Sequence, residues 1–150
     1  MQLQILQLYD KPEFISIIAD IYMQEWSWHY ADEWNIFTKE EMIFDLSNNL
    51  KNTYLAFKEN DFIGTIAVLD NDLRSHTHLT PWIACLYVCP KYRNQGFGKQ
   101  LMDYARSLSS DRVYLWCYTE REKKRYEKWG FKVIESCKYN NNMDAYVLSK

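Results

Sequence analysis

The chain has 150 residues, of which 47% are hydrophobic and 25% are charged, and its formal net charge is −2. This length and balance are typical of a globular domain, so we expect residues 1–150 to form a single domain. A slightly acidic chain carries no excess of basic residues with which to attract nucleic acid or an anionic membrane. No apolar run reaches the roughly 18 residues of a membrane span, and the N-terminus lacks the pattern of a secretory leader, which favours a cytoplasmic protein.

The N-terminal third of the chain predicts one strand followed by two helices. Residues 3–8 are expected to form the strand. Asp10 is a candidate N-cap for the first helix, because Glu13 follows it at capping-box spacing and apolar residues then recur at helical intervals. Thr38 and Glu41 repeat this pattern at the start of the second helix.

The rest of the chain alternates short apolar runs with turn signals and amphipathic segments, which predicts six more strands and two more helices. We therefore expect an α/β (α+β) fold with a mixed central sheet of about seven strands and about four helices. The expected segments are strands over 53–58 and 62–69 as a hairpin, a polar loop over 70–80, strands over 83–89 and 113–118, a helix after each of these two strands, and a final hairpin of strands 131–137 and 143–148.

The most informative motif follows the strand at 83–89 and runs from Arg93 to Lys99. A strand that leads through two glycines to the start of a helix presents unpaired backbone N–H groups, with the positive end of the helix dipole, to one small volume. That volume suits a diphosphate. A P-loop would need glycine at Arg93 and Ser or Thr at Gln100, and a dinucleotide fingerprint would need glycine at Leu101, so neither pattern fits.

The remaining pattern, Arg-x-x-Gly-x-Gly at residues 93–98, resembles the pyrophosphate loop of the GNAT family of N-acetyltransferases. A second motif supports this resemblance, because Tyr-x-x-x-Gly-Phe at residues 126–131 is similar to another signature of the family. The expected order of elements also matches the family from end to end. The resemblance implies the GNAT fold, in which two splayed central parallel strands, here 83–89 and 113–118, admit the pantetheine arm of acetyl-coenzyme A.

The resemblance also assigns roles to individual residues, with acetyl-coenzyme A as the cosubstrate and no metal. Tyr126 occupies the family position of the general acid that protonates the leaving thiolate. A backbone N–H near Val88 is expected to stabilise the oxyanion. The expected cofactor-binding residues are Leu86, Tyr87 and Val88 on the strand, Arg93, Asn94, Gln95, Gly96, Phe97, Gly98 and Lys99 in the loop, and Thr119, which a helix N-cap explains equally well.

The predicted binding site for the acetyl acceptor includes an aromatic and acidic segment near the end of the first helix. Glu25, Trp26 and His29 lie where the N-terminal helices of the family form the acceptor wall, and together with Trp82 they are the expected acceptor contacts. The acidic neighbours of this segment favour a cationic amine. The general base stays open among Glu25, His29, Asp70, Asp72 and His78, with ordered water as a further alternative.

Two functions follow from these motifs. The leading hypothesis is an acetyl-coenzyme A-dependent N-acetyltransferase of bacterial type that modifies a primary amine of a small molecule or peptide, as a monomer or homodimer. The alternative is a non-catalytic acyl-coenzyme A-binding sensor or interaction module, which would keep the glycine loop but have no use for Tyr126. Acyl transfer to a hydroxyl is a third hypothesis, and it would need a stronger base than the sequence offers.

The four cysteines are expected to be free, reduced and buried, because no pair has the close spacing of a metal site. The alternative is a zinc site formed by His76, His78, Cys85 and Cys89. We disfavour this alternative, because its ligands would come from a loop and from both ends of one strand.

Overall fold

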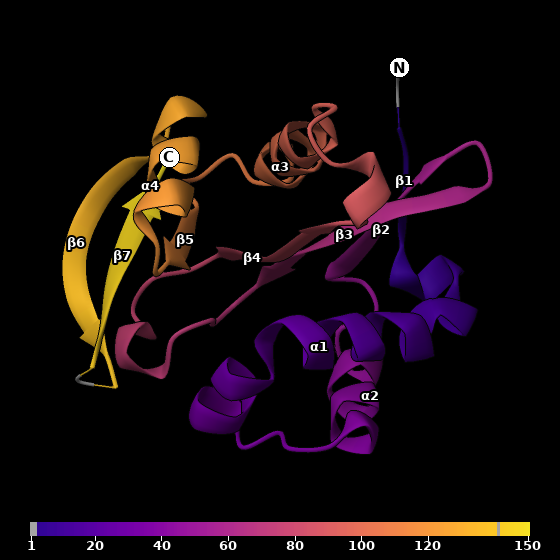
Figure 1. Ribbon diagram of the computed structural model, residues 1–150, viewed down its shortest axis with the longest axis horizontal. Helices are drawn as coiled ribbons and strands as arrows, with labels where there is room; N and C mark the ends of the chain where they lie inside the picture. The colour runs from indigo at the N-terminus through magenta and orange to yellow at the C-terminus, as the bar shows by residue number, and fades with distance from the viewer. Residues whose placement is uncertain (1–2, 141) are drawn as a thin grey trace.

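The computed structural model describes residues 3–140 and 142–150, and within these residues it forms one seven-stranded mixed sheet in the order β1-β2-β3-β4-β5-β7-β6. Helices α1 and α2 lie on one face of the sheet, and α3 and α4 lie on the other (Figure 1). The predicted fold class, the order of elements and both hairpins are confirmed. The elements are β1 (Gln4–Gln7), α1 (Ile15–Trp34), α2 (Lys39–Ser47), β2 (Thr53–Lys58), β3 (Asp61–Leu69), β4 (Trp82–Val88), α3 (Phe97–Ser107), β5 (Tyr114–Cys117), α4 (Glu120–Lys128), β6 (Lys132–Tyr139) and β7 (Met143–Ser149).

The first helix begins later than its sequence pattern predicts. Asp10 is the last residue of a short 3₁₀ helix, and a second 3₁₀ turn at Pro12–Phe14 separates it from α1, so the prediction of Asp10 as N-cap is wrong. Phe14 precedes α1 without a side-chain cap, and its ring packs against Phe57 and Phe62. Apolar contact with the sheet, rather than a capping hydrogen bond, therefore fixes where this helix starts.

The second helix begins as predicted. Thr38 Oγ1 accepts a hydrogen bond from the Glu41 N–H at 3.1 Å, and the Glu41 carboxylate accepts one from the Thr38 N–H at 3.0 Å. The pKa of the Glu41 carboxyl is held below its usual value, because it accepts hydrogen bonds from the Phe37 N–H and from the hydroxyl and N–H of Thr38. The reciprocal pair satisfies two backbone donors that the first turn of a helix leaves unpaired.

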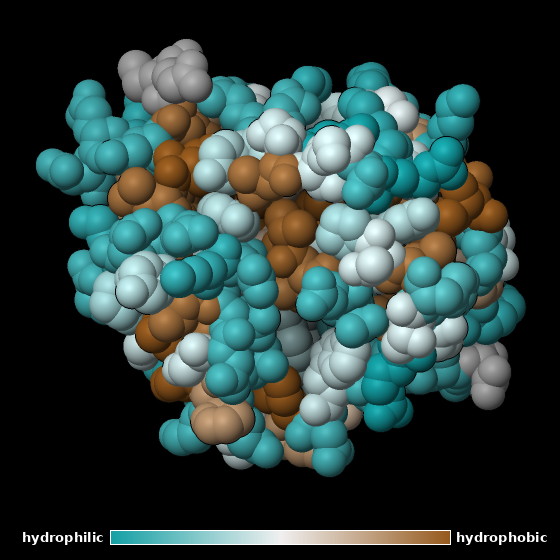
Figure 2. Space-filling view, turned by 180° about the vertical axis from the view of Figure 1, so that it is seen from behind, coloured by the Kyte–Doolittle hydropathy of each residue, from teal (hydrophilic) through white to brown (hydrophobic). Residues whose placement is uncertain are grey.

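Apolar side chains cover both faces of the sheet. On one face, Leu101 and Ala105 of α3 pack in the same buried cluster as Ile63, and on the other, Met42 and Leu46 of α2 pack with residues of β2. Each large side chain that is fully buried contributes about 1.5–3 kcal/mol. Apolar side chains also reach the surface, since Figure 2 shows a brown band near the middle of the rear face between teal hydrophilic flanks.

The two central strands separate along their length, as the resemblance implies. Strands β4 and β5 run parallel, and Trp82 with Tyr114 is their only aligned pair among the described residues. Cys85 has φ 57°, and the register of β4 against β3 shifts by one residue at this point. Such a bulge bends the strand that carries the extra residue. Beyond the bulge, the edge of β4 at residues 86–88 that faces β5 has no aligned partner there.

Helix α1 is broken at Trp26, where the backbone is not helical (φ −135°, ψ 26°). The second part of the helix brings Trp28 into edge contact with Trp116 of β5 and with Tyr118, so the broken helix reaches the region where the central strands separate. Within the described part of the chain, no helix is both long enough and apolar enough to cross a membrane.

Candidate active site

The loop between β4 and α3 leaves the N-terminus of α3 open. Gly96 is the N-cap of this helix, has φ 85°, and offers no side chain to satisfy the first-turn N–H groups. A Cβ atom at this position would meet nothing within 4 Å, so the backbone conformation and not crowding by the protein requires glycine. An uncapped N-terminus with this dipole is suited to an anionic ligand.

Arg93 connects the loop to the end of β4. Its Nε–H donates to the carbonyl of Val88 at 2.8 Å, and its guanidinium lies 5.4 Å from the ring centroid of Tyr87. This contact uses one of the five N–H donors of the guanidinium. In contrast, the Gln95 side chain donates to the carbonyl of Lys91, and Gln95 does not line the cavity that the other predicted cofactor residues share.

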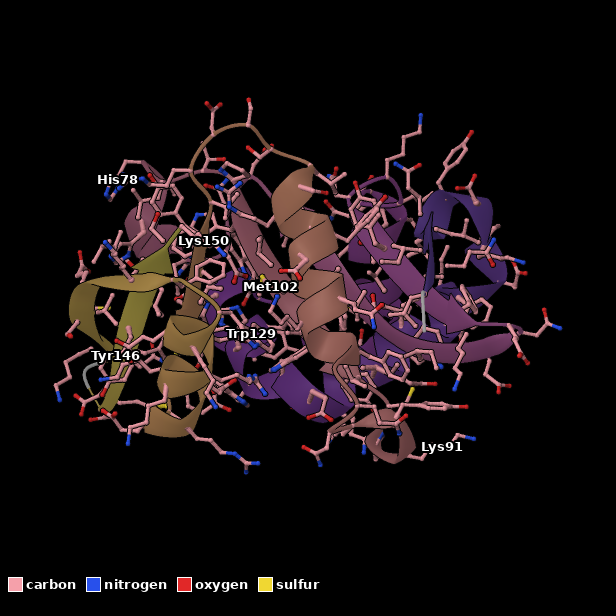
Figure 3. The ribbon with its side chains drawn as sticks, turned by 90° about the horizontal axis from the view of Figure 1, so that it is seen from above. His78, Lys91, Met102, Trp129, Tyr146 and Lys150 are labelled. Carbon is pink, nitrogen blue, oxygen red and sulfur yellow. The ribbon has the colours of Figure 1, made fainter. Side chains whose placement is uncertain are left out.

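A large cavity of about 690 Å³, partly open to solvent, extends from this loop to the start of α4. Figure 3 shows Met102 of α3, and Trp129 directly after the end of α4, in the space between these two helices. Arg121 and Arg125 line the cavity, although their charged run resembles a solvent-exposed helix face in the sequence. The other lining residues are Glu25, Trp26, Leu86, Tyr87, Val88, Tyr92, Arg93, Asn94, Gly96, Phe97, Gly98, Lys99, Tyr118, Thr119, Glu122 and Trp129.

The Tyr-x-x-x-Gly-Phe motif is the C-terminal cap of α4. The N–H of Phe131 donates to the carbonyl of Tyr126 at 3.0 Å, and the N–H of Gly130 donates to the carbonyl of Glu127 at 3.0 Å. These two hydrogen bonds are those of a Schellman motif. The motif therefore fixes the last turn of the helix, and with it the position of Tyr126.

Tyr126 is buried, with 8% of its surface exposed, and it lines a second cavity. Burial raises the pKa of its hydroxyl to about 12. A phenol with this pKa is protonated at neutral pH and can donate its proton to a stronger base.

The second cavity is smaller, about 90 Å³, and six of the sixteen residues that line it are tryptophans or tyrosines. It adjoins the first cavity, because Trp26, Leu86, Tyr118 and Glu122 line both. None of the described residues that line it is a lysine or an arginine. The remaining lining residues are Trp28, His29, Tyr30, Asp72, Ile83, Ala84, Cys85, Met102, Leu115, Trp116, Cys117 and Tyr126.

Two buried titratable residues meet in this second cavity. His29 Nε2 lies 3.7 Å from Asp72 Oδ1, and His29 Nδ1 lies 3.2 Å from the Tyr139 hydroxyl. Asp72 Oδ2 accepts a hydrogen bond from the indole N–H of Trp116 at 2.9 Å. Burial raises the pKa of Asp72, and the nearby His29 imidazole and the hydrogen bond from Trp116 oppose the rise. Among the described residues His29 Nε2 has no hydrogen-bond partner, so this atom is suited to a polar ligand group.

The four predicted acceptor residues lie in four different positions. His29 lines the second cavity, Trp26 lines both cavities, and Glu25 is exposed and lines the first cavity. Trp82 is fully buried, and its indole N–H donates to the carbonyl of Leu79 at 2.7 Å. The prediction of Trp82 as an acceptor contact is wrong, because its position at the start of β4 places it in the core.

The general-base candidates also separate. Asp72 shares the second cavity with His29, whereas Asp70 lines a different hollow and His78 stacks on His76. The position of Trp116 of β5 in the wall of the second cavity was not predicted from the sequence. Its signal was the alternation of residues 114–117, in which Leu115 and Cys117 are buried and Trp116 lies on the opposite face.

Thr119 is the N-cap of α4. The sequence predicted this role as the alternative to a cofactor contact. Thr119 Oγ1 accepts from the Glu122 N–H at 3.1 Å and donates to the Glu122 carboxylate at 3.0 Å. The cap therefore holds Glu122 where the two cavities meet.

The cysteines do not form the predicted alternative zinc site. All four are free, and Cys117 is buried while the other three are half-buried. Cys85 Sγ lies 3.1 Å from the Tyr30 hydroxyl, and Cys89 Sγ lies 3.7 Å from the carbonyl of Phe62. Neither thiol joins a group of metal-ligating side chains within the described residues.

Comparison with known proteins agrees with this geometry. The family model of the acetyltransferase (GNAT) domain matches residues 49–133. The structure of aminoglycoside 6'-N-acetyltransferase with coenzyme A is similar to this chain, with a TM-score of 0.72 at 14% identity. The match covers 100% of this chain and 96% of that chain. A search of curated proteins gives no match.

Two further solved structures share the fold over their whole length. Ard1 from Thermoplasma volcanium has a TM-score of 0.71 at 19% identity, with 100% of this chain and 97% of that chain covered. Naa50 from Arabidopsis thaliana, in complex with the bisubstrate analogue CoA-Ac-MVNAL, has a TM-score of 0.61 at 21% identity, with 100% and 99% covered. Because the family model spans more than half of the chain and contains both its glycine loop and its tyrosine motif, this protein belongs to the GNAT family of acetyltransferases.

Proposed function

We propose that the protein transfers the acetyl group of acetyl-coenzyme A to the primary amine of a small cationic molecule or a peptide. The observation that carries this proposal is the junction of the two cavities at Trp26, Leu86, Tyr118 and Glu122. A thioester bound in the first cavity and an amine bound in the second would meet there. Among the structures that share the fold, the aminoglycoside 6'-N-acetyltransferase contains coenzyme A and Naa50 contains a coenzyme A-peptide bisubstrate analogue.

The first cavity suits coenzyme A along its whole length. The open N-terminus of α3 offers backbone N–H groups to the diphosphate, and Arg93, Arg121 and Arg125 add positive charge around it. The unpaired edge of β4 at residues 86–88 offers backbone donors and acceptors to the amide groups of the pantetheine arm. This assigns Gln95 no direct role.

The second cavity suits an ammonium group. Aromatic faces attract a cation with about 0.5–2 kcal/mol each, and three tryptophans and two tyrosines besides Tyr126 line the walls. The carboxylates of Asp72 and Glu122 add negative charge, and Asp72 is buried. A cationic acceptor therefore fits this cavity better than an anionic one.

The chemistry needs a neutral amine, a stabilised oxyanion and a proton for the thiolate. His29 is our candidate to accept the amine proton, because its Nε2 has no hydrogen-bond partner among the described residues and lies 3.7 Å from the Asp72 carboxylate. The amine nitrogen then attacks the thioester carbonyl, and a backbone N–H of β4 near Val88 stabilises the oxyanion. As the C–S bond breaks, Tyr126 donates its proton to the coenzyme A sulfur.

The test is a screen for thiol release from acetyl-coenzyme A with polyamines, aminoglycosides, amino acids and peptides as acceptors. We expect turnover with at least one cationic amine, and we expect Tyr126→Phe to lower kcat on the order of 10²-fold with little change in coenzyme A affinity. Tyr104→Phe, in a tyrosine that packs on Tyr54 outside both cavities, is the matched control. Tight coenzyme A binding without turnover on any amine would instead support the non-catalytic module.

A further inference from the structure

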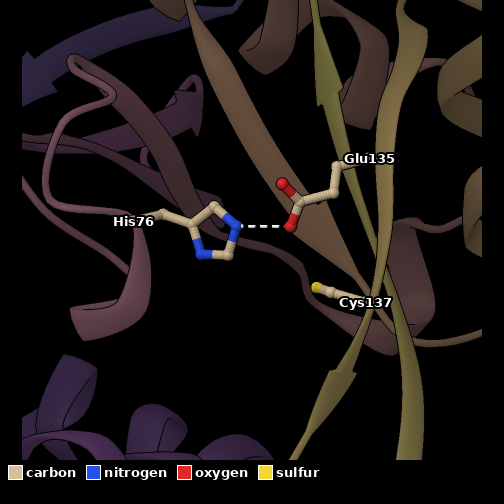
Figure 4. Close-up of side chains that lie close together, drawn as sticks. All are labelled: His76, Glu135 and Cys137. Atoms are coloured by element: carbon tan, nitrogen blue, oxygen red, sulfur yellow. Dashed lines mark hydrogen bonds and ion pairs between the residues drawn. The ribbon is translucent and has the colours of Figure 1, made fainter.

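A group of three metal-ligating side chains lies outside both cavities. His76 comes from a 3₁₀ turn in the loop between β3 and β4, and Glu135 and Cys137 come from β6. Glu135 and Cys137 are two positions apart on one strand, so their side chains lie on the same face. Figure 4 shows the His76 imidazole directed from its loop toward the two side chains on the strand.

The ligand atoms of the three side chains lie close together. The imidazole nitrogen, the carboxylate oxygen and the thiol sulfur are all within 4.8 Å of one another. His76 Nε2 lies 2.6 Å from Glu135 Oε2. A tetrahedral ion about 2.0–2.1 Å from each would hold these two atoms roughly 3.3 Å apart, so they need to separate by less than an ångström.

The residues around His76 hold its imidazole in an orientation that suits metal binding. His76 is buried, and its Nδ1 lies 2.7 Å from Ser75 Oγ. When Nδ1–H donates to this oxygen, the lone pair of Nε2 faces Glu135 and is available to a cation, which is the usual outer support of a metal-binding histidine. The ring also stacks on His78, with centroids 5.8 Å apart and an interplanar angle of 24°.

We propose that His76, Glu135 and Cys137 bind one zinc ion, with water in the fourth position. Imidazole nitrogen, thiolate sulfur and carboxylate oxygen are the three ligand types of Zn²⁺ in proteins, whereas Mg²⁺ and Ca²⁺ take oxygen ligands. The ion displaces a proton from the Cys137 thiol and the proton held between His76 and Glu135. This site replaces the pairing of His76 with Cys85 and Cys89, which the structure does not assemble.

The position of the site gives it a structural role. His76 is four residues after Asp72, and Cys137 is two residues before Tyr139. Asp72 and Tyr139 both contact His29 in the second cavity. The bound ion therefore ties the loop that carries Asp72 to the strand that carries Tyr139. His78 marks this end of the molecule in Figure 3, and Lys91, next to the glycine loop, lies toward the opposite end.

The test is metal binding by the whole protein after removal of bound ions with a chelator. Calorimetric titration with ZnCl₂ should give one saturable site, and titration with Co²⁺ should give a thiolate-to-cobalt charge-transfer absorption band. Both Cys137→Ser and His76→Gln should weaken zinc affinity by at least about tenfold. Cys89→Ser, in a half-buried thiol outside the group, should leave the affinity and the band unchanged.

Circular dichroism of each metal-free variant checks that it is folded, so that a loss of binding reports the missing ligand. Absence of saturable binding at micromolar zinc in the folded wild-type protein would overturn the proposal. A cobalt band that persists in Cys137→Ser would also overturn it, because another thiol would then be the ligand. Neither result depends on the acetyl acceptor or on turnover.

Discussion

Replacing Asp72 with asparagine tests the proposal that the second cavity binds a cationic acceptor. Asp72 is buried beside His29, and one of its oxygens accepts the Trp116 indole N–H at 2.9 Å. Asparagine keeps the shape and can keep that hydrogen bond through its carbonyl oxygen. The substitution therefore removes a negative charge and little else.

The size of the effect follows from the distance at which an ammonium can approach. A unit charge about 4 Å from a carboxylate gains about 1 kcal/mol in bulk water and about 4 kcal/mol at an effective dielectric constant near 20. Because each 1.4 kcal/mol is a factor of ten, we expect kcat/KM for a dicationic acceptor to fall by about fivefold to several hundredfold in Asp72→Asn. The effective dielectric constant in the second cavity is closer to that of a protein than to that of bulk water, because Asp72 is buried. We therefore expect a loss of kcat/KM near the upper limit.

The assay compares a diamine with the amino alcohol of the same length, so that both present one reacting amine and only the diamine carries a second charge. Asp72→Asn should reduce kcat/KM for the diamine more than for the amino alcohol. Glu25→Gln is the matched control, since it removes the same charge from an exposed residue that lines only the first cavity. Its effect should be smaller, because solvent screens exposed charges.

The effect of Asp72→Asn on folding stability also has an expected direction. Burial raises the pKa of Asp72, so the ionised carboxylate is less favourable in the folded than in the unfolded protein. This group therefore costs stability above its folded pKa, and the cost disappears as the pH falls below its unfolded pKa. Asp72→Asn should leave the Tm at neutral pH unchanged or higher. Equal losses of kcat/KM for both acceptors, or a lower Tm with unchanged kinetics, would refute the reasoning.

Two glycine substitutions separate cofactor binding from folding. Gly96→Val should weaken coenzyme A binding by at least about tenfold in calorimetry, because the side chain enters the space at the N-terminus of α3, while the left-handed backbone adds about 1–2 kcal/mol of strain. Unchanged affinity would exclude the loop from the binding site. Gly64→Ala should instead lower the free energy of unfolding by about 1–3 kcal/mol in denaturant titration, because its Cβ would lie 2.2 Å from the Tyr87 carbonyl oxygen in the neighbouring strand. Wild-type stability would mean that β3 and β4 can move apart at no cost.

The parts of the site that the sequence predicted are those whose geometry is local. The glycine loop depends on backbone angles within a few residues, and the motif at residues 126–131 is a helix cap with hydrogen bonds inside one turn. The capping residues Thr38 and Thr119 were predicted for the same reason. The prediction of Asp10 as an N-cap was wrong because the start of α1 is set by the packing of Phe14 on the sheet, which no local sequence pattern indicates.

The parts that could not be predicted depend on contacts between distant segments. His29 and Asp72 were separate candidates for one role, and only the fold brings them to 3.7 Å. Trp82 lies in an apolar context that fits a core and a cavity wall equally well, and its burial decides between them. The bulge at Cys85 leaves no mark in the sequence, because the apolar run around it continues without interruption.

The placement of the tryptophans gives the protein an optical reporter of its own. Trp28 and Trp116 line the second cavity, Trp129 lines the first, and Trp26 lines both. Indole emission shifts to shorter wavelength when water next to the ring is replaced by a less polar group, so occupancy of either cavity should change the intrinsic fluorescence. Trp82 is fully buried away from both and contributes a constant background. Acceptors can therefore be screened by fluorescence titration without a label and without turnover.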